Sequence, residues 1–400
     1  MTHDRGSVPR WWDGASSATP SSATRLASRP SHFTEIPRAR RPHGGRRARS
    51  LRVRRPIPRG FGFLTTVNVE DDTAPLSTKF RTRFAGRNTT YSTTDAFVKV
   101  FEGVGAEKRI ARTVAFDEAQ SASEHRVSPS ITYRDDSRVD FELLKDPGTL
   151  GTMLADAESD GLQRELLLAG AGRLIARVHT APAEPSMSVE DVRNERLTSF
   201  GSISLSRWID ASAGELECWR LFHHDTSLVN AVDNFRLAIS REKTRSPIHA
   251  DLRLDQVVFS EGRLWIVDFE EYRYGWPGLD LGSFVGSILH EAVLRAVSSI
   301  DTEHDSVLGA HEEIVGTMVD ALRTAAPDAK QFLTAYEESG GYRVDRVDLG
   351  RCVGWFIIGR TIARSMLAAQ LSAIDKALAG IGRQALIDPE SASELFGNVR

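Results

Sequence analysis

The sequence predicts an α+β fold of two lobes, a small lobe with an antiparallel sheet and a larger helical lobe. Three observations favour this fold. Short runs of strand-forming residues gather between residues 80 and 144. Beyond residue 146, apolar residues recur mainly at helical spacing. One strand–turn–strand pattern interrupts that helical part at 257–267. A chain of 400 residues is long enough for two such units.

Residues 1–60 differ from the rest in composition. They hold 14 Arg, no Lys and three acidic residues, a formal charge of +11. The whole chain carries −3, so the other 340 residues carry −14. We expect this Arg/Ser/Pro-rich tail to be disordered, because little in it could form a buried face. It lacks aromatic residues interleaved with the basic ones, so nucleic-acid binding is not favoured. An extension translated from an upstream start codon is the simpler interpretation.

The small lobe is expected over residues 61–145. Its predicted elements are, in order, a strand at 80–84, a polar loop at 85–90, a strand at 96–101, a helix at 107–125, and two strands at 130–133 and 139–144. Lys99 stands in the middle of the apolar strand at 96–101. Pro147 and Gly148 then break the chain before the large lobe.

The large lobe is expected over residues 146–400. The pattern predicts a helix at 162–179, a loop or lid at 202–210, helical structure at 213–241, helices at 284–297, 308–325 and 328–337, and one long helix or two at 345–378. We expect His179, at the end of its helix, to be packed and not catalytic. Trp208, Trp219 and Phe222 are expected in the core.

The most informative stretch surrounds the predicted hairpin. His249-Ala-Asp-Leu-Arg-Leu-Asp-Gln256 precedes it, and Val267-Asp-Phe-Glu270 follows it. Because a hairpin returns the chain to its start, Asp251, Gln256 and Asp268 are expected to meet in one cleft. Phosphoryl transfer needs such a set: a carboxylate accepts the proton of the attacking hydroxyl, and an amide oxygen and a second carboxylate hold Mg²⁺. Solvated turn residues are the alternative, which two agreeing spacings disfavour.

This stretch resembles the catalytic core of the aminoglycoside phosphotransferase family, which also includes choline kinases and bacterial maltokinases. Those enzymes carry His-Gly-Asp, then four residues, then Asn, and later Ile-Asp-Phe/Trp-Glu. Here Ala250 replaces the Gly and Gln256 the Asn, and maltokinase-like members also carry Gln. The resemblance covers about residues 80–290. It implies a protein-kinase-like two-lobe fold, with ATP or GTP and Mg²⁺ as cofactors.

The resemblance also implies a role for each residue of the stretch. Asp251 is the expected proton acceptor. His249 is expected to support it by hydrogen bonds to the loop backbone, without transferring a proton. Gln256 and Asp268 are the expected metal ligands, and Asp280 is expected to brace the catalytic loop. Arg253 stands where many relatives have His, and it is given no role.

In the small lobe, the resemblance makes Lys99 the residue that binds the α- and β-phosphates. A glutamate from the following helix is expected to orient it, and the candidates are Glu107, Glu118 and Glu124. Glu118 is preferred because it lies 19 residues after Lys99 and 11 before Pro129, but the choice among the three stays open.

The second strand of the pair at 130–144 is expected to lead into the hinge between the lobes. There the adenine would be held by backbone groups and not by side chains. Glu142 and Leu144 are the residues whose backbone groups are expected to make these contacts.

Three functional hypotheses follow. The first is a kinase for a hydroxyl-bearing small molecule such as an aminoglycoside, a sugar or an amino alcohol; the −14 body suits a cationic acceptor. The second is a kinase for Ser or Thr of a precursor peptide, because the catalytic motif looks like that of stand-alone kinases in actinobacterial lanthipeptide-like or thioamitide-like maturation, which act beside a partner enzyme. The third is a pseudokinase that binds nucleotide without turnover. The oligomeric state stays open.

Composition points to a cytoplasmic protein. Two cysteines, Cys218 and Cys352, form neither a disulfide framework nor a zinc site. No apolar run reaches the roughly 18 residues of a membrane span. The basic tail is not followed by the apolar segment of a signal peptide.

Overall fold

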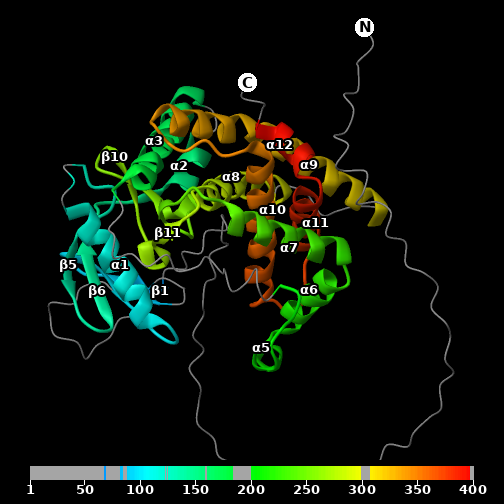
Figure 1. The fold of residues 1–400 in the computed structure, drawn as a ribbon, viewed down its shortest axis with the longest axis horizontal. Coiled ribbons are helices and arrows are strands. Elements are labelled where there is room, and N and C mark those ends of the chain that lie inside the picture. The colour runs from blue at the N-terminus through cyan, green and yellow to red at the C-terminus, as the bar shows by residue number, and fades with distance from the viewer. Residues whose placement is uncertain are drawn as a thin grey trace, which may run out of the picture.

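The computed structural model describes residues 67–68, 82–83, 88–121, 123, 125–157, 160–182, 200–298 and 307–396, with the backbone alone at 67–68, 82–83 and 307–312. Two lobes are visible in Figure 1, with the small sheet and helix α1 on the left and the helical lobe filling the rest. The predicted α+β two-lobe fold is therefore confirmed. The tail at 1–60 and residues 85–87 of the polar loop lie outside the described residues.

The small lobe contains a four-stranded antiparallel sheet in the order β3-β4-β6-β5. Its elements are β3 (Thr89–Ser92), β4 (Ala96–Val100), α1 (Ala106–Ser121), β5 (Ile131–Arg134) and β6 (Arg138–Glu142), preceded by the paired strands β1 (Val67–Asn68) and β2 (Thr82–Arg83). Lys99 on β4 lies opposite Thr90 on one side and Val139 on the other. The central strand thus holds Lys99 at a fixed position.

The chain crosses between the lobes at residues 143–147. Strand β6 ends at Glu142, and β7 (Gly148–Thr149) pairs with β9 of the large lobe. The crossing is attached to the hairpin turn, because the Ser260 hydroxyl donates to the Lys145 carbonyl at 2.7 Å. Thr149 then caps the first helix of the large lobe by accepting from the Thr152 N–H.

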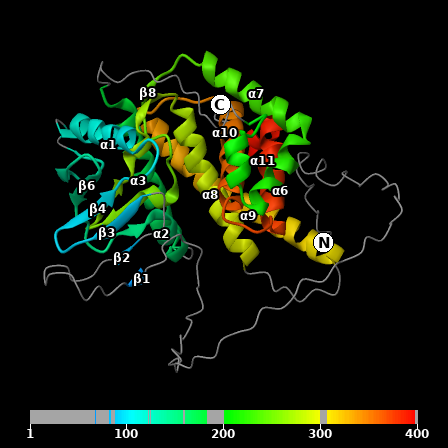
Figure 2. The ribbon, with the colours of Figure 1, turned by 90° about the horizontal axis from the view of Figure 1, so that it is seen from below.

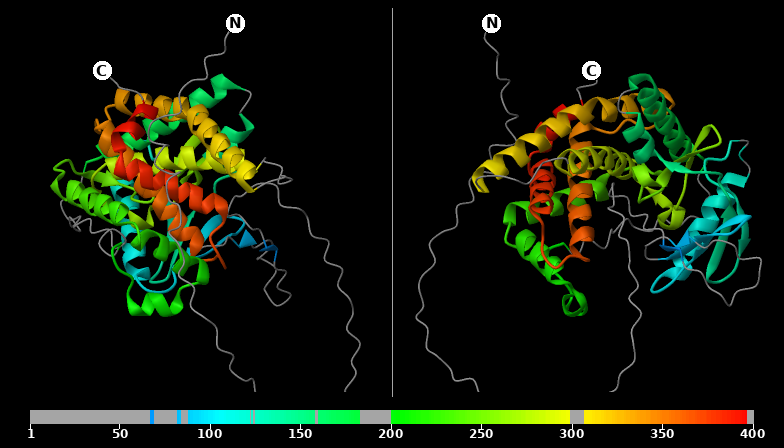
Figure 3. Two further views of the ribbon diagram at one scale, coloured as in Figure 1. Left: turned by 90° about the vertical axis from the view of Figure 1, so that its right-hand side faces the viewer. Right: turned by 180° about the vertical axis from the view of Figure 1, so that it is seen from behind.

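The large lobe is mainly helical. Its helices are α2 (Leu150–Asp156), α3 (Gly161–Thr180), α5 (Leu205–Asp210), α6 (Ala213–His223), α7 (Thr226–Arg241), α8 (Gly278–Ser298), α9 (Val307–Glu338), α10 (Arg346–Ser365), α11 (Ala373–Ile387) and α12 (Pro389–Ser393). The short strands β8 (Ser246–Ile248), β9 (Val257–Ser260), β10 (Arg263–Ile266) and β11 (Arg273–Gly275) form two small sheets, β10-β9-β7 and β11-β8. Helix α8 lies in the middle of the lobe and packs against α9 and α10 (Figures 2 and 3). The site hairpin β9–β10 is therefore supported by a buried helical core.

One predicted helix boundary was wrong. Helix α9 continues through Pro327, where we predicted a break. Proline removes one backbone donor, but Ala325 and Ala329 on either side are buried, and Asp328 binds Arg164 of α3 with N–O distances of 2.9 Å. Tertiary packing therefore holds the helix together. The stretch 345–378 forms two helices, and a capping box at Ser372 starts the second.

The segment predicted as a loop or lid contains the short helix α5. Trp208 on that helix is 54% exposed, so its expected place in the core was wrong. Trp219 and Phe222 on α6 are buried as predicted. In the part of the chain that the structure describes, no helix is both long and apolar enough to span a membrane.

Candidate active site

The loop that follows β8 is held by one buried carboxylate. Asp280, in the first turn of α8, accepts from the backbone N–H of His249 at 2.6 Å and of Ala250 at 2.7 Å. The Nε2 of His179 lies 3.2 Å from the same carboxylate. Burial raises the pKa of Asp280, but the bond to His179 and the charge and N–H of His249 outweigh it, so the pKa is lowered. The predicted bracing by Asp280 and the packed position of His179 are confirmed.

Ala250 adopts an unusual backbone conformation, with φ of +67°. This left-handed region costs a residue with a Cβ about 1–2 kcal/mol. Relatives carry Gly at this position, which fits it without strain. Here the hydrogen bond from the Ala250 N–H to Asp280 offsets part of that cost.

His249 joins the two ends of the hairpin. Its Nε2 lies 2.9 Å from the Val267 carbonyl, so Nε2–H donates, and Nδ1 accepts from the Asp251 N–H at 3.3 Å. The side chain is buried, and both ring nitrogens bond to backbone. One imidazole therefore links Asp251 to the residue before Asp268, which brings the two predicted carboxylates to the same end of the hairpin.

Three polar side chains meet beside β10. Asp268, with φ of +71°, contacts the Lys99 ammonium, and the Gln256 Nε2 lies 3.4 Å from its other oxygen. A 180° flip of the Gln256 side-chain amide would place its oxygen, in place of its nitrogen, beside Asp268. An amide oxygen beside a carboxylate fits Mg²⁺, which takes few protein ligands and completes its shell with phosphates and water. Within the described residues, no group of three or more His, Cys, Asp and Glu side chains could form a metal cage.

Lys99 is buried between two carboxylates. Its ammonium contacts Asp268 and lies 2.8 Å from Glu270. Burial lowers the pKa of Lys99, but the charges of Asp268 and Glu270 outweigh it, so the pKa is raised and the ammonium stays charged. The strand lysine is thus directed toward the predicted metal ligand.

Glu270 is itself held by the small lobe. Asn88 Nδ2 donates to it at 2.6 Å, and Arg109 Nε on α1 lies 3.8 Å from the same oxygen. Arg109 also donates to the Asn88 side chain at 3.2 Å and to the Glu102 carbonyl at 2.6 Å. Asn88 belongs to the polar loop predicted at 85–90. A buried network therefore connects that loop, α1 and Lys99.

Helix α1 faces the segment Phe269–Glu271. Phe116 stacks on Phe269 with ring centroids 3.4 Å apart, and Arg112 pairs with Glu271 at 2.9 Å. Arg109, Arg112 and Phe116 are spaced at i, i+3 and i+7, which places them on one side of a helix. The helix thus presents cations and an aromatic ring to the site, where the resemblance implied a glutamate.

The preferred pairing of Glu118 with Lys99 was wrong. Glu118 pairs with Arg134 at 3.1 Å, and its side chain is 66% exposed. The buried residues of α1 include Phe116 and Gln120; a residue midway between them lies on the opposite face at 100° per residue. Glu107 is also exposed. The third candidate, Glu124, lies outside the described residues.

Asp251 lies at the open side of the loop, with a half-exposed side chain that pairs with Arg253. Arg253 is 17% exposed and also bonds to Asp255 at 2.9 Å. Burial lowers the pKa of Arg253, but the charges of Asp251 and Asp255 outweigh it and raise the pKa. Sequence reasoning gave Arg253 no role. An Arg two residues after the loop Asp, with a second acid two residues later, was the signal that could have identified it.

The hinge residues Glu142 and Leu144 lie where β6 leaves the sheet. The Glu142 N–H donates to the Ser130 carbonyl at 2.9 Å, so only its carbonyl can serve the adenine. Leu144 is half-buried at the start of the crossing. A carbonyl and an N–H two residues apart suit an adenine edge, and the contacts themselves stay a prediction.

Comparison with known proteins gives one family match. The model of the family described as "Phosphotransferase enzyme family" matches residues 77–306, which include Lys99 and the whole catalytic loop. A search of curated proteins finds no match.

Solved structures with similar folds include a choline/ethanolamine kinase family protein from Mesorhizobium loti, with 16% identity, 80% of this chain and 92% of that chain covered, and a TM-score of 0.46. The gentamicin complex of APH(2″)-IIa has 12% identity, covers 78% and 90%, and has a TM-score of 0.45. Amicoumacin kinase hAmiN in complex with AMP-PNP, Ca²⁺ and Ami has 15% identity, covers 77% of this chain and 88% of that chain, and has a TM-score of 0.49.

Proposed function

Because the chain belongs to the phosphotransferase enzyme family, we propose that it transfers the γ-phosphoryl group of ATP to a hydroxyl of a cationic small molecule. Members of this family are kinases that use a nucleoside triphosphate and a divalent metal with an alcohol as acceptor. The observation that carries the proposal is the meeting of Lys99, Gln256 and Asp268 beside a loop braced by Asp280.

Each residue of the catalytic loop has a distinct task in this proposal. Asp251 orients the acceptor hydroxyl and accepts its proton as the oxygen attacks the γ-phosphorus. Arg253 holds the Asp251 carboxylate in place, since the two are paired at the open side of the loop. Asp268 and Gln256 hold Mg²⁺. When bound, the metal neutralises charge that develops on the phosphoryl oxygens.

Lys99 binds the α- and β-phosphates as a buried point charge. We assign its positioning to Glu270, which contacts Lys99 from the catalytic hairpin side and is held by Asn88 and Arg109. This arrangement replaces a helix glutamate by a carboxylate that follows the metal-binding Asp268. A displacement of Phe269–Glu271 would therefore move Lys99 and the metal ligand together.

A cationic acceptor suits the charge of the site. The body of the chain carries −14, and Asp251 and Asp255 both have side chains about half exposed at the mouth of the loop. Aminoglycosides, amino sugars and amino alcohols combine a hydroxyl with a positive charge, and such carboxylates raise the local concentration of cations. Ser or Thr of a precursor peptide is the second acceptor class.

The test measures ADP release with Mg²⁺ and ATP over a panel of aminoglycosides, amino sugars, choline and Ser/Thr peptides. We expect at least one cationic hydroxyl compound to stimulate ADP release, and we expect Asp251→Asn to abolish that stimulation. Stimulation by peptides alone would replace the small molecule by the peptide acceptor. Binding of Mg²⁺-ATP without ADP release under any condition would establish the pseudokinase and overturn the proposal.

A further inference from the structure

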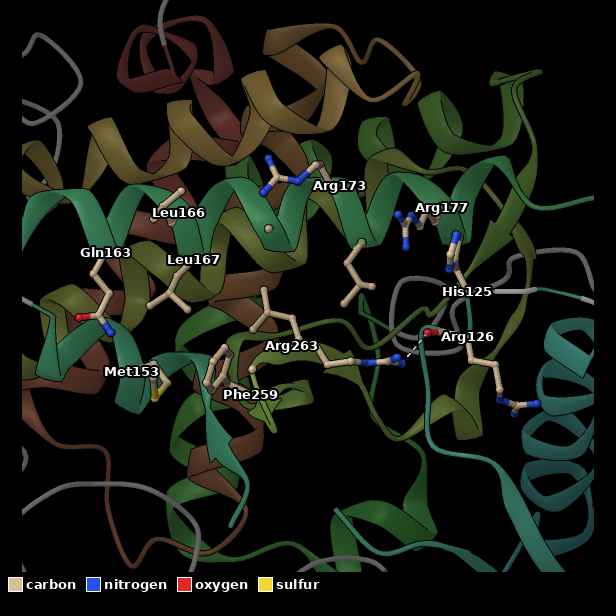
Figure 4. Close-up of a pocket in the computed structure, with 14 residues that line it drawn as sticks. His125, Arg126, Met153, Gln163, Leu166, Leu167, Arg173, Arg177, Phe259 and Arg263 are labelled. Carbon is tan, nitrogen blue, oxygen red and sulfur yellow. Dashed lines mark hydrogen bonds between the residues drawn. The ribbon is translucent and has the colours of Figure 1, made fainter. Parts of the chain in front are cut away.

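A second site lies away from the catalytic cleft. A groove of about 490 Å³ runs between α3 and the β9–β10 hairpin (Figure 4). Phe259 and Leu264 line it from the hairpin, and the chain at His125 and Arg126 borders it. None of the residues assigned to phosphoryl transfer lines this groove. It is therefore a separate surface on the far side of the same hairpin.

One part of the groove is strongly basic. Arg173 and Arg177 lie one turn apart on the exposed side of α3, and Arg263 extends from the hairpin turn toward Arg126 (Figure 4). Within the described residues, no carboxylate lies within ion-pair distance of these three guanidinium groups. Arg263 is nevertheless well ordered by its neighbours: it stacks 3.4 Å above the Trp265 ring and donates to the Arg126 carbonyl at 2.9 Å. Three unpaired arginines in a body of charge −14 call for an anionic partner.

The other part of the groove is apolar. Leu167 of α3 points toward Met153 and Phe259 (Figure 4), and Leu166 lines the same groove. Leu166 is 59% exposed, which leaves an apolar side chain open to a partner. Basic and apolar parts side by side exclude a simple anion as the best ligand, because such an ion would leave the leucines in water.

We propose that this groove docks a short extended peptide segment in which acidic residues adjoin bulky apolar residues. The groove follows α3 from Gln163 to Arg177, a rise of about 21 Å at 1.5 Å per residue. An extended peptide of about six residues covers the same length at 3.3 Å per residue. The acidic residues pair with Arg173, Arg177 and Arg263, and the apolar residues lie on Leu166.

Residues 1–60 carry +11, so their charge does not complement the arginines. We take the docking segment to belong to another protein. The proposal does not depend on phosphoryl transfer, so its failure would leave the proposed kinase activity untouched.

The experiment selects seven-residue peptides from a randomised phage-displayed library on the full chain. The selected peptides are then synthesised with a fluorescent label and titrated by anisotropy. We expect at least two acidic residues next to Leu, Ile or Phe in the enriched sequences. The variant R173E/R177E should weaken their binding at least about tenfold, and Leu166→Ser should weaken it severalfold.

The matched control is R236E/R323E, which makes the same change of charge at exposed helix positions outside the groove. This control and wild type should bind the peptides equally, and all variants should keep the same melting temperature. No enrichment, enrichment without acidic residues, or equal binding by R173E/R177E would overturn the proposal. The proposal would also be overturned if tripolyphosphate displaced the labelled peptides and Leu166→Ser bound them with unchanged affinity. It would likewise be overturned if the wild type formed a dimer that the R173E/R177E substitutions dissociate.

Discussion

The two sides of the cleft that meet at Lys99 are built in different ways. On the large-lobe side, the loop is braced by Asp280, which contacts His179 and accepts from the His249 N–H, and by the His249 ring, which bonds to the Val267 carbonyl. On the small-lobe side, Arg109 and Arg112 of α1 reach across to the glutamates that follow Asp268.

This difference shows which parts of the site are fixed locally and which depend on packing between the lobes. The loop geometry depends on the hairpin and on the buried Asp280 carboxylate of α8, which accepts from the loop backbone. The contact between the lobes depends on which face of α1 is turned inward. Here that face presents Arg109 and Arg112 where a glutamate was expected. Lys99 keeps a glutamate partner, but the partner comes from the large lobe.

The largest expected effect comes from breaking the large-lobe side at the metal ligand. Asp268→Asn should lower kcat/KM for ATP by at least ~10³-fold, because the metal loses its charged ligand and Lys99 loses a contact. Steady-state ADP release gives the value. Asp255→Asn, a carboxylate of the same loop without contact to Lys99, is the control and should stay within about tenfold of wild type. Equal losses in both variants would contradict the assignment.

The contribution of Asp280 should be measurable in the free energy of unfolding and in the pH dependence of that free energy. Asp280→Asn should cost about 3 kcal/mol of unfolding free energy at pH 7, because an amide cannot accept from all three donors that surround it. The pKa of Asp280 is lowered in the folded protein. Its stabilisation is therefore present above the unfolded value of about 3.9 and is lost as the pH falls through the lower folded value. Urea unfolding at pH 7 and pH 3 measures this, and a gap between variant and wild type that widens in acid would contradict the account.

The small-lobe side is tested by substituting two glutamates, Glu270, which contacts Lys99, and Glu118, which pairs with Arg134. Glu270→Gln should lower kcat/KM about tenfold, mainly through a raised KM for ATP, because Lys99 and Arg109 lose their shared charge. Glu118→Gln should change it less than about twofold, since its only described ion pair, with Arg134, is exposed. In a double-mutant cycle, Glu270→Gln should cause no further loss of kcat/KM when Lys99→Met is already present. A larger effect at Glu118 than at Glu270 would reverse our assignment.

The smallest expected effect concerns the strained residue of the loop. Ala250→Gly should stabilise the protein by about 1 kcal/mol, because glycine adopts a φ of +67° without steric cost. Calorimetry should detect a melting temperature raised by a few degrees. A lowered melting temperature would show that the left-handed conformation costs nothing here.

Local spacing was enough to predict the catalytic loop. The hairpin brings His249 to the Val267 carbonyl and Gln256 to Asp268, as the order of the residues predicts, and the role of Asp251 stays a prediction. The partner of Lys99 was not predictable in this way. Glu118 has a suitable distance along the chain but lies on the outer face of α1, and only tertiary packing of Phe116 on Phe269 fixes that phase.

Arg253 and the continuity of α9 were also not predicted. Arg253 was given no role because it stands where many relatives have His, and its pairing with Asp251 and Asp255 is a local contact that the family motif does not include. The break expected at Pro327 failed because packing against Arg164 outweighed a local preference. At Pro327 a contact between elements overrode a pattern within one element, whereas at Arg253 a local spacing was overlooked.

The most direct test of the central claim compares binding of AMP-PNP with and without Mg²⁺ by calorimetry, in wild type and in Asp268→Asn. If Asp268 and Gln256 hold the metal that bridges the phosphates, Mg²⁺ should strengthen nucleotide binding at least about tenfold in wild type and have little effect in the variant. An equal strengthening by Mg²⁺ in both proteins would contradict the account.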